Sequence, residues 1–135
     1  MRLATYEDYP RIEKALRWMA LNSTAPKMKN INEDKALDYV STQIVMGNVL
    51  ITNGCLVMGE PSQSWFSDDK LFIEDLFIAF DKTYNIQAAI EDLVLHAKSL
   101  GCCEVVVGDT QIGLMIPHYE AAGFTRLGTQ LHRRI

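Results

Sequence analysis

Residues 71–80 read LFIEDLFIAF, residues 81–85 read DKTYN, and residues 86–101 read IQAAIEDLVLHAKSLG. The first run, with Lys70 before it, has the length and the apolar content of a buried strand. In the third run apolar residues recur at helical spacing, which predicts an amphipathic helix that ends at Gly101. The β-branched run at residues 104–107 predicts another strand. This strand–helix–strand unit predicts two parallel neighbours joined by a right-handed crossover.

The first third of the chain predicts a short strand and two helices. We expect a strand at residues 2–5, and then a helix that Asp8 caps, with Pro10 in its first turn. A second helix is predicted between Asn32 as its cap and Gly47 as its end. The predicted buried faces consist of apolar side chains at helical spacing: Ile12, Ala15, Leu16 and Met19 in the first helix, and Ala36, Leu37, Val40 and Ile44 in the second.

The middle of the chain predicts a β-hairpin. Residues 49–52 and 55–58 have the composition of strands, and Asn53-Gly54 between them is the strongest short-range hairpin signal. Residues 60–69 follow as an expected polar connection that contains two aromatic residues.

The end of the chain predicts a short helix and, at residues 128–134, a closing strand. The order of elements is therefore β α α β β β α β α β. This order predicts an α/β fold with a mixed sheet. A chain of 135 residues is large enough to bury one core, so we expect a single domain over residues 1–135.

Composition and charge limit the classes of function. The net charge is −4, and because nucleic-acid binders usually have a basic excess, we expect no nucleic-acid partner. No apolar run has the length of a membrane span, and residues 1–9 lack the pattern of a signal peptide. The three cysteines are odd in number, and the two adjacent ones do not have zinc-ligand spacing. We therefore expect a cytoplasmic protein without a membrane partner or a metal site.

Three stretches of the sequence resemble a known family: FIEDLFI at residues 72–78, AKSLGC at residues 97–102, and HYEAAGFTRLGT at residues 118–129. With the order of elements, they resemble the GCN5-related N-acetyltransferase (GNAT) family over nearly the whole chain. The resemblance implies an acyl-CoA N-acyltransferase fold, in which a mixed, mostly antiparallel sheet carries helices on both faces. It also implies direct transfer from acetyl-CoA to a primary amine of a small molecule or protein, in a ternary complex. Many members of the family are dimers, so a homodimer is compatible with the resemblance.

The resemblance also implies roles for named residues. The backbone of Leu76, Phe77 and Ile78 would bind the pantetheine arm along a strand that splays away from its neighbour, and a backbone N–H there would polarise the thioester carbonyl. Tyr119, which precedes a Gly-Phe pair, would donate a proton to the leaving CoA thiolate. The alternative for Tyr119 is structural, as a buried aromatic residue that packs a short helix on the sheet.

Three carboxylates are candidates for the base that deprotonates the amine. Glu74 and Asp75 are adjacent in a strand, so their side chains should point to opposite faces of the sheet, and one of them is expected to face the cleft. The sequence around Glu74 also resembles amino-sugar N-acetyltransferases of the family. Asp109 is the third candidate, at the mouth of the cleft. The alternative is that two of the three are solvated or cap a helix.

The turn after the first strand departs from the family pattern. In the family a Q/R-x-x-G-x-G/A signature presents backbone N–H groups to the CoA pyrophosphate. Counting from the strand places Thr83 at the Gln/Arg position, and Ile86 and Ala88 at the glycine positions. Counting back from Gly101 moves the match by two residues, and neither count recovers a glycine. The cofactor contacts that the resemblance implies here are Lys82, Thr83, Tyr84, Asn85, Ile86, Gln87 and Ala88.

Two functions of different classes follow from these signals. The first, which we predict, is an N-acetyltransferase with a weakened cofactor turn. The second is a non-catalytic domain of the same fold that serves as a binding or structural module and has lost tight CoA binding. Tyr119 and the carboxylates favour the first, and the glycine-free turn favours the second. The acceptor is expected to bind over residues 27–31 and 60–69.

Overall fold

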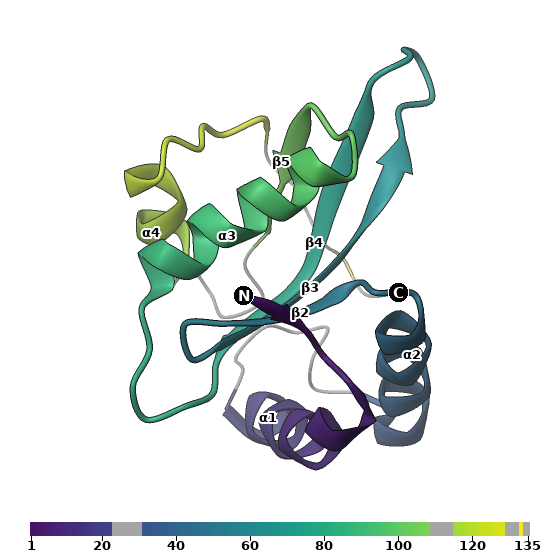
Figure 1. The fold of residues 1–135 in the computed structure, drawn as a ribbon, viewed down its shortest axis with the longest axis vertical. Coiled ribbons are helices and arrows are strands. Elements are labelled where there is room, and N and C mark those ends of the chain that lie inside the picture. Colours follow the sequence, from purple (N-terminus) through teal and green to yellow (C-terminus); the bar gives the residue numbers. More distant parts are fainter. Residues whose placement is uncertain (23–30, 109–114, 129–132, 134–135) are drawn as a thin grey trace.

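A computed structural model describes residues 1–22, 31–108, 115–128 and 133. Its centre is a five-stranded sheet in which the spatial order of the strands follows the chain (Figure 1). Strands 1 and 2, 2 and 3, and 3 and 4 pair antiparallel, and strands 4 and 5 pair in parallel. The strands are β1 (Arg2–Leu3), β2 (Val49–Thr52), β3 (Cys55–Gln63), β4 (Lys70–Ala79) and β5 (Glu104–Val106).

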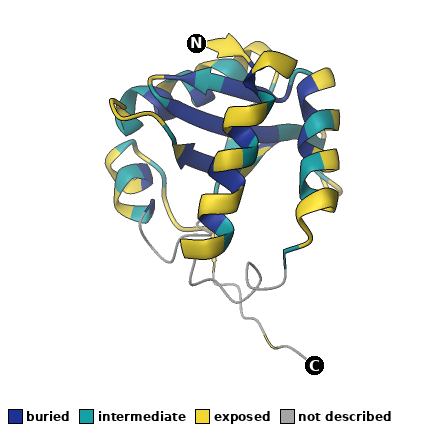
Figure 2. Cartoon of the chain, turned by 90° about the horizontal axis from the view of Figure 1, so that it is seen from below, coloured by how far each residue is buried: buried dark blue, intermediate teal, exposed yellow. Residues whose placement is uncertain are grey.

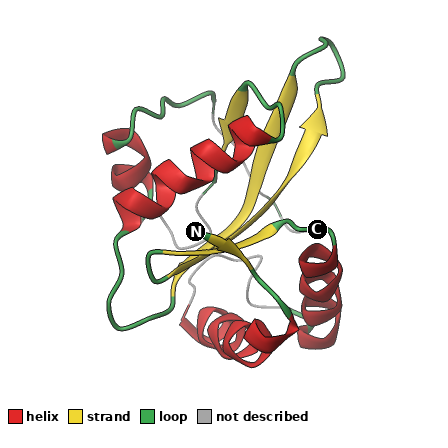
Figure 3. Cartoon of the chain, in the orientation of Figure 1, coloured by secondary structure: helices red, strands yellow, loops and turns green. Residues whose placement is uncertain are grey.

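Helices cover both faces of this sheet, as Figure 3 shows. The helical elements are η1 (Tyr6–Asp8), α1 (Tyr9–Asn22), α2 (Glu33–Val45), α3 (Ile86–Ser99) and α4 (Ile116–Ala121). Apolar residues of α1 and α2 form one core cluster with one face of the sheet, and those of α3 and α4 form a second cluster with the other face. Figure 2 shows the buried residues concentrated in the strands and on the inward sides of the helices. Among the described residues, none of the helices combines the length and apolar character needed to cross a membrane.

Local signals in the sequence account for the ends of these elements. Asn53 and Gly54 have φ angles of 48° and 75°, which is the two-residue hairpin turn expected between β2 and β3. Gly101, with a φ angle of 81°, follows α3 in a Schellman motif, in which its own N–H donates to Lys98 O and the next N–H donates to Ala97 O. Asn32 caps α2 by accepting a hydrogen bond from Lys35 N at 3.1 Å.

Two predicted details are wrong. Asp8 does not cap α1, because its carboxylate accepts hydrogen bonds from Thr5 N and from the Arg2 guanidinium, and η1 precedes the helix. Residues 60–63 are not part of a connection, because β3 continues to Gln63 and pairs with β4 along that length. The predicted closing strand at residues 128–134 lies largely outside the described residues.

Candidate functional site

The site is organised by the divergence of β4 and β5. The two strands pair only at Leu71–Glu104, Phe72–Val105 and Ile73–Val106. β4 continues to Ala79, and among the described residues no strand pairs with residues 75–79 on the side of β5. We call the backbone of residues 75–79 on this side the open edge of β4. Such an edge presents main-chain N–H and C=O groups that an extended ligand can use.

The side chains along the open edge belong to the core. Leu76 and Ile78 lie in the cluster with α1 and α2, and Phe77 lies in the cluster with α3 and α4. All three residues are buried. Their side chains are therefore committed to packing, and the backbone is the part of residues 76–78 that remains for the predicted pantetheine contact.

A β-bulge at Asp75 sets the directions of the neighbouring carboxylates. Met58 pairs with Leu76 and Gly59 pairs with Glu74, so Asp75 is the extra residue on β4. Opposite residues in an antiparallel pair share a face of the sheet. A Cβ atom on Gly59 would lie 2.6 Å from the Phe72 ring, so Gly59 and Glu74 share the face that α3 covers.

Asp75 lies on the other face, against α2. The Tyr39 hydroxyl donates a hydrogen bond to Asp75 Oδ2 at 3.2 Å. Burial, together with the nearby Asp75 and Glu60 carboxylates, raises the pKa of Tyr39 to about 12. The phenol therefore stays protonated at neutral pH and holds Asp75 as an acceptor. The prediction that Glu74 and Asp75 face opposite ways agrees with this arrangement, while no sequence signal pointed to Tyr39.

Tyr119 lies in α4 on the same face of the sheet as Glu74. Tyr119 is 3% exposed, and its ring packs edge-on to the Phe77 ring, with the centroids 6.1 Å apart. The Phe124 ring also contacts it, with a centroid distance of 5.3 Å. Gly123 ends α4 with a φ angle of 90°, and Phe124 N donates to Tyr119 O at 3.0 Å. The Gly-Phe pair thus turns the chain so that Phe124 packs against Tyr119.

Glu74 lies where β4 and β5 separate. Its Oε2 atom accepts a hydrogen bond from Gly108 N at 3.3 Å, just beyond the end of β5. Glu74 is partly exposed, and it shares its face of the sheet with Tyr119. The structure therefore brings these two predicted catalytic residues to one side of β4. The third, Asp109, and most of the predicted acceptor loop at residues 27–31 lie outside the described residues.

The turn between β4 and α3 is bound to the β2–β3 hairpin. Phe80 N and Asp81 N both donate to Gly54 O, at 3.0 and 3.2 Å, and Asn85 N donates to Asn53 O at 2.9 Å. The contact is close, because a Cβ atom on Gly54 would lie 2.2 Å from Thr83 O. The side chains of the three turn residues Lys82, Thr83 and Tyr84 are exposed.

Asn85 and Gln87 use their side chains within the protein. Asn85 caps α3, since its Oδ1 atom accepts a hydrogen bond from Ala88 N at 3.0 Å. Gln87 Nε2 donates to His118 O at 2.9 Å and so ties the start of α3 to α4. Ile86 packs against the core cluster beneath α3 and α4. An Asn three residues before Ala88 and ahead of an apolar helical run is a cap signal that the sequence contained.

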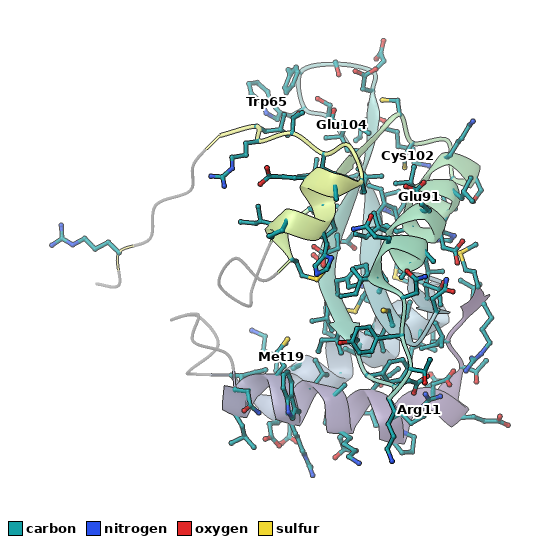
Figure 4. The ribbon with its side chains drawn as sticks, turned by 90° about the vertical axis from the view of Figure 1, so that its left-hand side faces the viewer. Arg11, Met19, Trp65, Glu91, Cys102 and Glu104 are labelled. Atoms are coloured by element: carbon teal, nitrogen blue, oxygen red, sulfur yellow. The ribbon has the colours of Figure 1, made fainter. Side chains whose placement is uncertain are left out.

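Arg11 is a charged neighbour of this turn that the sequence did not indicate. Its guanidinium forms an ion pair with Asp81 and lies 4.4 Å from the centroid of the Phe80 ring. Figure 4 labels Arg11 on α1, at the end of the molecule opposite Trp65. The negative charge of Asp81 in the turn is therefore balanced from α1.

The architecture is similar to solved acetyltransferase structures along nearly its whole length. A predicted acetyltransferase with acetyl-CoA from Clostridium acetobutylicum is 14% identical, with a TM-score of 0.68 over 97% of this chain and 92% of that chain. A possible acetyltransferase from Clostridium difficile 630 is 12% identical, with a TM-score of 0.66 over 99% and 95%. An acetyltransferase from Trypanosoma brucei is 16% identical, with a TM-score of 0.58 over 99% and 97%.

These likenesses show the fold. The chain has the GNAT-like α/β fold that the sequence predicts, with a mixed, mostly antiparallel sheet and helices on both faces. No model of a known protein family matches the sequence, and no curated protein matches it either.

Proposed function

We propose that this protein is an N-acetyltransferase that moves an acetyl group from a CoA thioester to a primary amine. The observation that carries the proposal is the open edge of β4, with Glu74 of this strand and Tyr119 of α4 on the same face of the sheet. The neighbours described as acetyltransferases support general acetyl transfer, and one of them is described with acetyl-CoA.

The proposed reaction uses the chain's own groups at each proton transfer. The pantetheine arm lies along the backbone of residues 76–78, where a main-chain N–H polarises the thioester carbonyl. Glu74 accepts a proton from the ammonium group, and the neutral amine attacks the carbonyl carbon. The C–N bond forms, the C–S bond breaks, and the thiolate takes a proton from the Tyr119 hydroxyl. The acylated nitrogen then loses its second proton, which returns to the Tyr119 phenolate through solvent, and Glu74 releases its proton to solvent. The products are the N-acetyl amine and the free thiol.

A non-catalytic module of the same fold is the second candidate. The observation that favours it is the turn at residues 80–85, where three N–H groups are already bound to the β2–β3 hairpin. A module of this kind would keep the fold and the buried Tyr119 as packing, and it would release no thiol.

The two candidates are separated by one pair of measurements. Purified protein is incubated with acetyl-CoA at millimolar concentration and a panel of small amines and lysine peptides, and free thiol is followed over time. Thermal denaturation with acetyl-CoA is measured in parallel, because a ligand that binds only the folded state raises the melting temperature. We expect amine-dependent thiol release above the rate of hydrolysis. No release with any amine, with or without a thermal shift, would reject the enzyme.

A further inference from the structure

We infer that this protein recognises its acyl donor through the pantetheine thioester and makes little use of the nucleotide. This inference rests on the proposed function and names the donor class as acyl-pantetheine thioesters, with CoA as one member. Three features of the turn between β4 and α3 carry it: the use of its N–H groups, its packing, and its charges.

The first feature is how the N–H groups of the turn are used. Nucleotide-binding turns hold pyrophosphate with main-chain N–H groups that have no internal partner. Here the N–H groups of Phe80, Asp81 and Asn85 donate to carbonyl oxygens of the β2–β3 turn. Ala88 N, in the first turn of α3, donates to the side chain of Asn85. Four N–H groups at the two ends of the turn and in the first turn of α3 are therefore engaged inside the protein.

The second feature is the packing beneath the turn. A Cβ atom on Gly54 would lie 2.2 Å from Thr83 O and 2.9 Å from Tyr84 Cα, so the two turns are in direct backbone contact. Redirecting the Phe80 and Asp81 N–H groups toward a ligand would break their bonds to Gly54 O. The N–H groups of Ile86 and Gln87 lie next to the Ile86 side chain, where a glycine would give a phosphate closer access.

The third feature is the charge around the turn. Asp81 contributes a carboxylate, and the Arg11 guanidinium, which could otherwise attract a phosphate, is paired with it. Lys82 carries the remaining positive charge of the turn on an exposed side chain. A single exposed ammonium group in water attracts an anion only weakly, in the same way that exposed ion pairs are weak.

The pantetheine arm has a different environment. The open edge of β4 lies on the opposite side of the strand from β3, and its backbone is not engaged by β5 beyond Ile73. Glu74 belongs to β4 and Tyr119 packs on Phe77 of the same strand. A donor held along this edge would therefore bring its thioester toward both side chains even if the nucleotide extended into solvent. Transfer from S-acetylpantetheine balances in the same way as transfer from acetyl-CoA, with pantetheine thiol as the product.

The test compares kcat/KM for acetyl-CoA and S-acetylpantetheine with the same amine. We expect the two values to agree within about tenfold, which corresponds to about 1.4 kcal/mol of transition-state binding. A preference for acetyl-CoA of more than about a hundredfold would overturn the inference while leaving the proposed function intact. Absence of transfer with both donors would reject the proposed function. In that case titration calorimetry compares the dissociation constants of CoA and pantetheine. Values within about tenfold of each other would support the inference, and a preference for CoA of more than about a hundredfold would overturn it. Absence of binding by both would overturn it too.

Two variants of the turn sharpen this comparison. Thr83→Arg with Ile86→Gly restores a cation and a glycine, and we expect it to raise the acetyl-CoA to S-acetylpantetheine ratio by about tenfold or more. Lys82→Gln removes the exposed ammonium group and should change the same ratio by less than about threefold. A large fall in the ratio for Lys82→Gln would show that the nucleotide is bound through this side chain, against the inference. If the double variant fails to fold, the ratio measured for Lys82→Gln still tests the inference.

Discussion

At the scale of single residues, Tyr119 offers the most direct test of the chemistry. We expect Tyr119→Phe to lower kcat by about 10²–10⁴-fold, because the phenol acts on the leaving thiolate in the transition state. Donor binding and the melting temperature should change little, since the ring keeps its contacts with Phe77 and Phe124. Steady-state kinetics and thermal denaturation measure both. An unchanged kcat would leave Tyr119 with a packing role only.

Glu74 and Asp75 form a matched pair for testing the base, because they are adjacent and point to opposite faces of the sheet. Glu74→Gln should lower kcat/KM by about 10²–10⁴-fold and alter the alkaline-rising limb of the pH–rate profile. Asp75→Asn should leave that limb in place, because Asp75 is bound to the Tyr39 hydroxyl on the face of α2. The reverse result would move the role to Asp75, and two normal profiles would direct attention to Asp109.

The residues of the site could be predicted from the sequence only where they belong to a local pattern. Tyr119 precedes a Gly-Phe pair, and Glu74 lies in an apolar strand, so both were visible as candidates. Arg11 and Tyr39 lie on helices that are distant in sequence from β4, and their contacts with Asp81 and Asp75 arise from tertiary packing. No periodicity or spacing marks such contacts.

At the scale of elements, substitutions of glycine by alanine separate the contributions of backbone conformation and of packing to the free energy of unfolding. Gly54→Ala combines a φ angle of 75° with a Cβ atom 2.2 Å from Thr83 O, so it should destabilise the protein by more than the strain of about 1–2 kcal/mol alone. Gly101→Ala has a φ angle of 81° and open space around the Cβ position, so it should cost only that strain. Gly108→Ala, which has no positive φ angle and no described atom within 4 Å of the Cβ position, is the control.

Urea denaturation of the three variants orders these effects. We expect the loss of unfolding free energy to rise from Gly108→Ala through Gly101→Ala to Gly54→Ala. An equal loss for Gly54→Ala and Gly101→Ala would mean that the hairpin and the β4–α3 turn move apart easily. That result would show that the contact with the β2–β3 hairpin does not stabilise the β4–α3 turn.

Most helices and strands could be predicted from the sequence, and the errors in their predicted bounds have physical causes. The Asn-Gly turn and the terminal Gly101 fix local backbone conformation, so their sequence signals are strong. The end of β3 reads GEPSQ, whose polar residues and proline resemble a loop, yet Pro61 pairs with Phe72 of β4. Pairing with a long apolar partner strand overrides the local propensity there. The bulge at Asp75, which fixes the face of Glu74, depends on the register between two strands and has no local signal.

At the scale of the whole molecule, His96 should make stability depend on pH. Its Nε2 atom is buried, has no hydrogen-bond partner among the described residues, and its ring lies edge-on to Phe72. Burial lowers the pKa of His96 below 6.5. Because the unfolded chain then binds a proton more readily than the folded protein, the free energy of unfolding should fall as the pH drops from 6.5 toward the folded pKa.

Urea denaturation between pH 5 and pH 7.5 tests this expectation, with wild type and His96→Leu compared at each pH. The variant should lose part of the wild-type slope in the window below 6.5, while other titrating groups contribute equally to both proteins. Parallel curves for the two proteins would show that His96 does not control this dependence.

The strand order β1-β2-β3-β4-β5 has a further consequence, for the time course of assembly. β2, β3 and β4 are joined by short hairpin connections, so their pairing closes small loops and should form early. β5 can join β4 only after α3 has crossed over the sheet, and it then gains three residue pairs. The pairing of β5 with β4 is thus expected to form after the pairing of the central strands and to open before it. Hydrogen exchange of Glu104–Val106 would then be faster than exchange of the central strands.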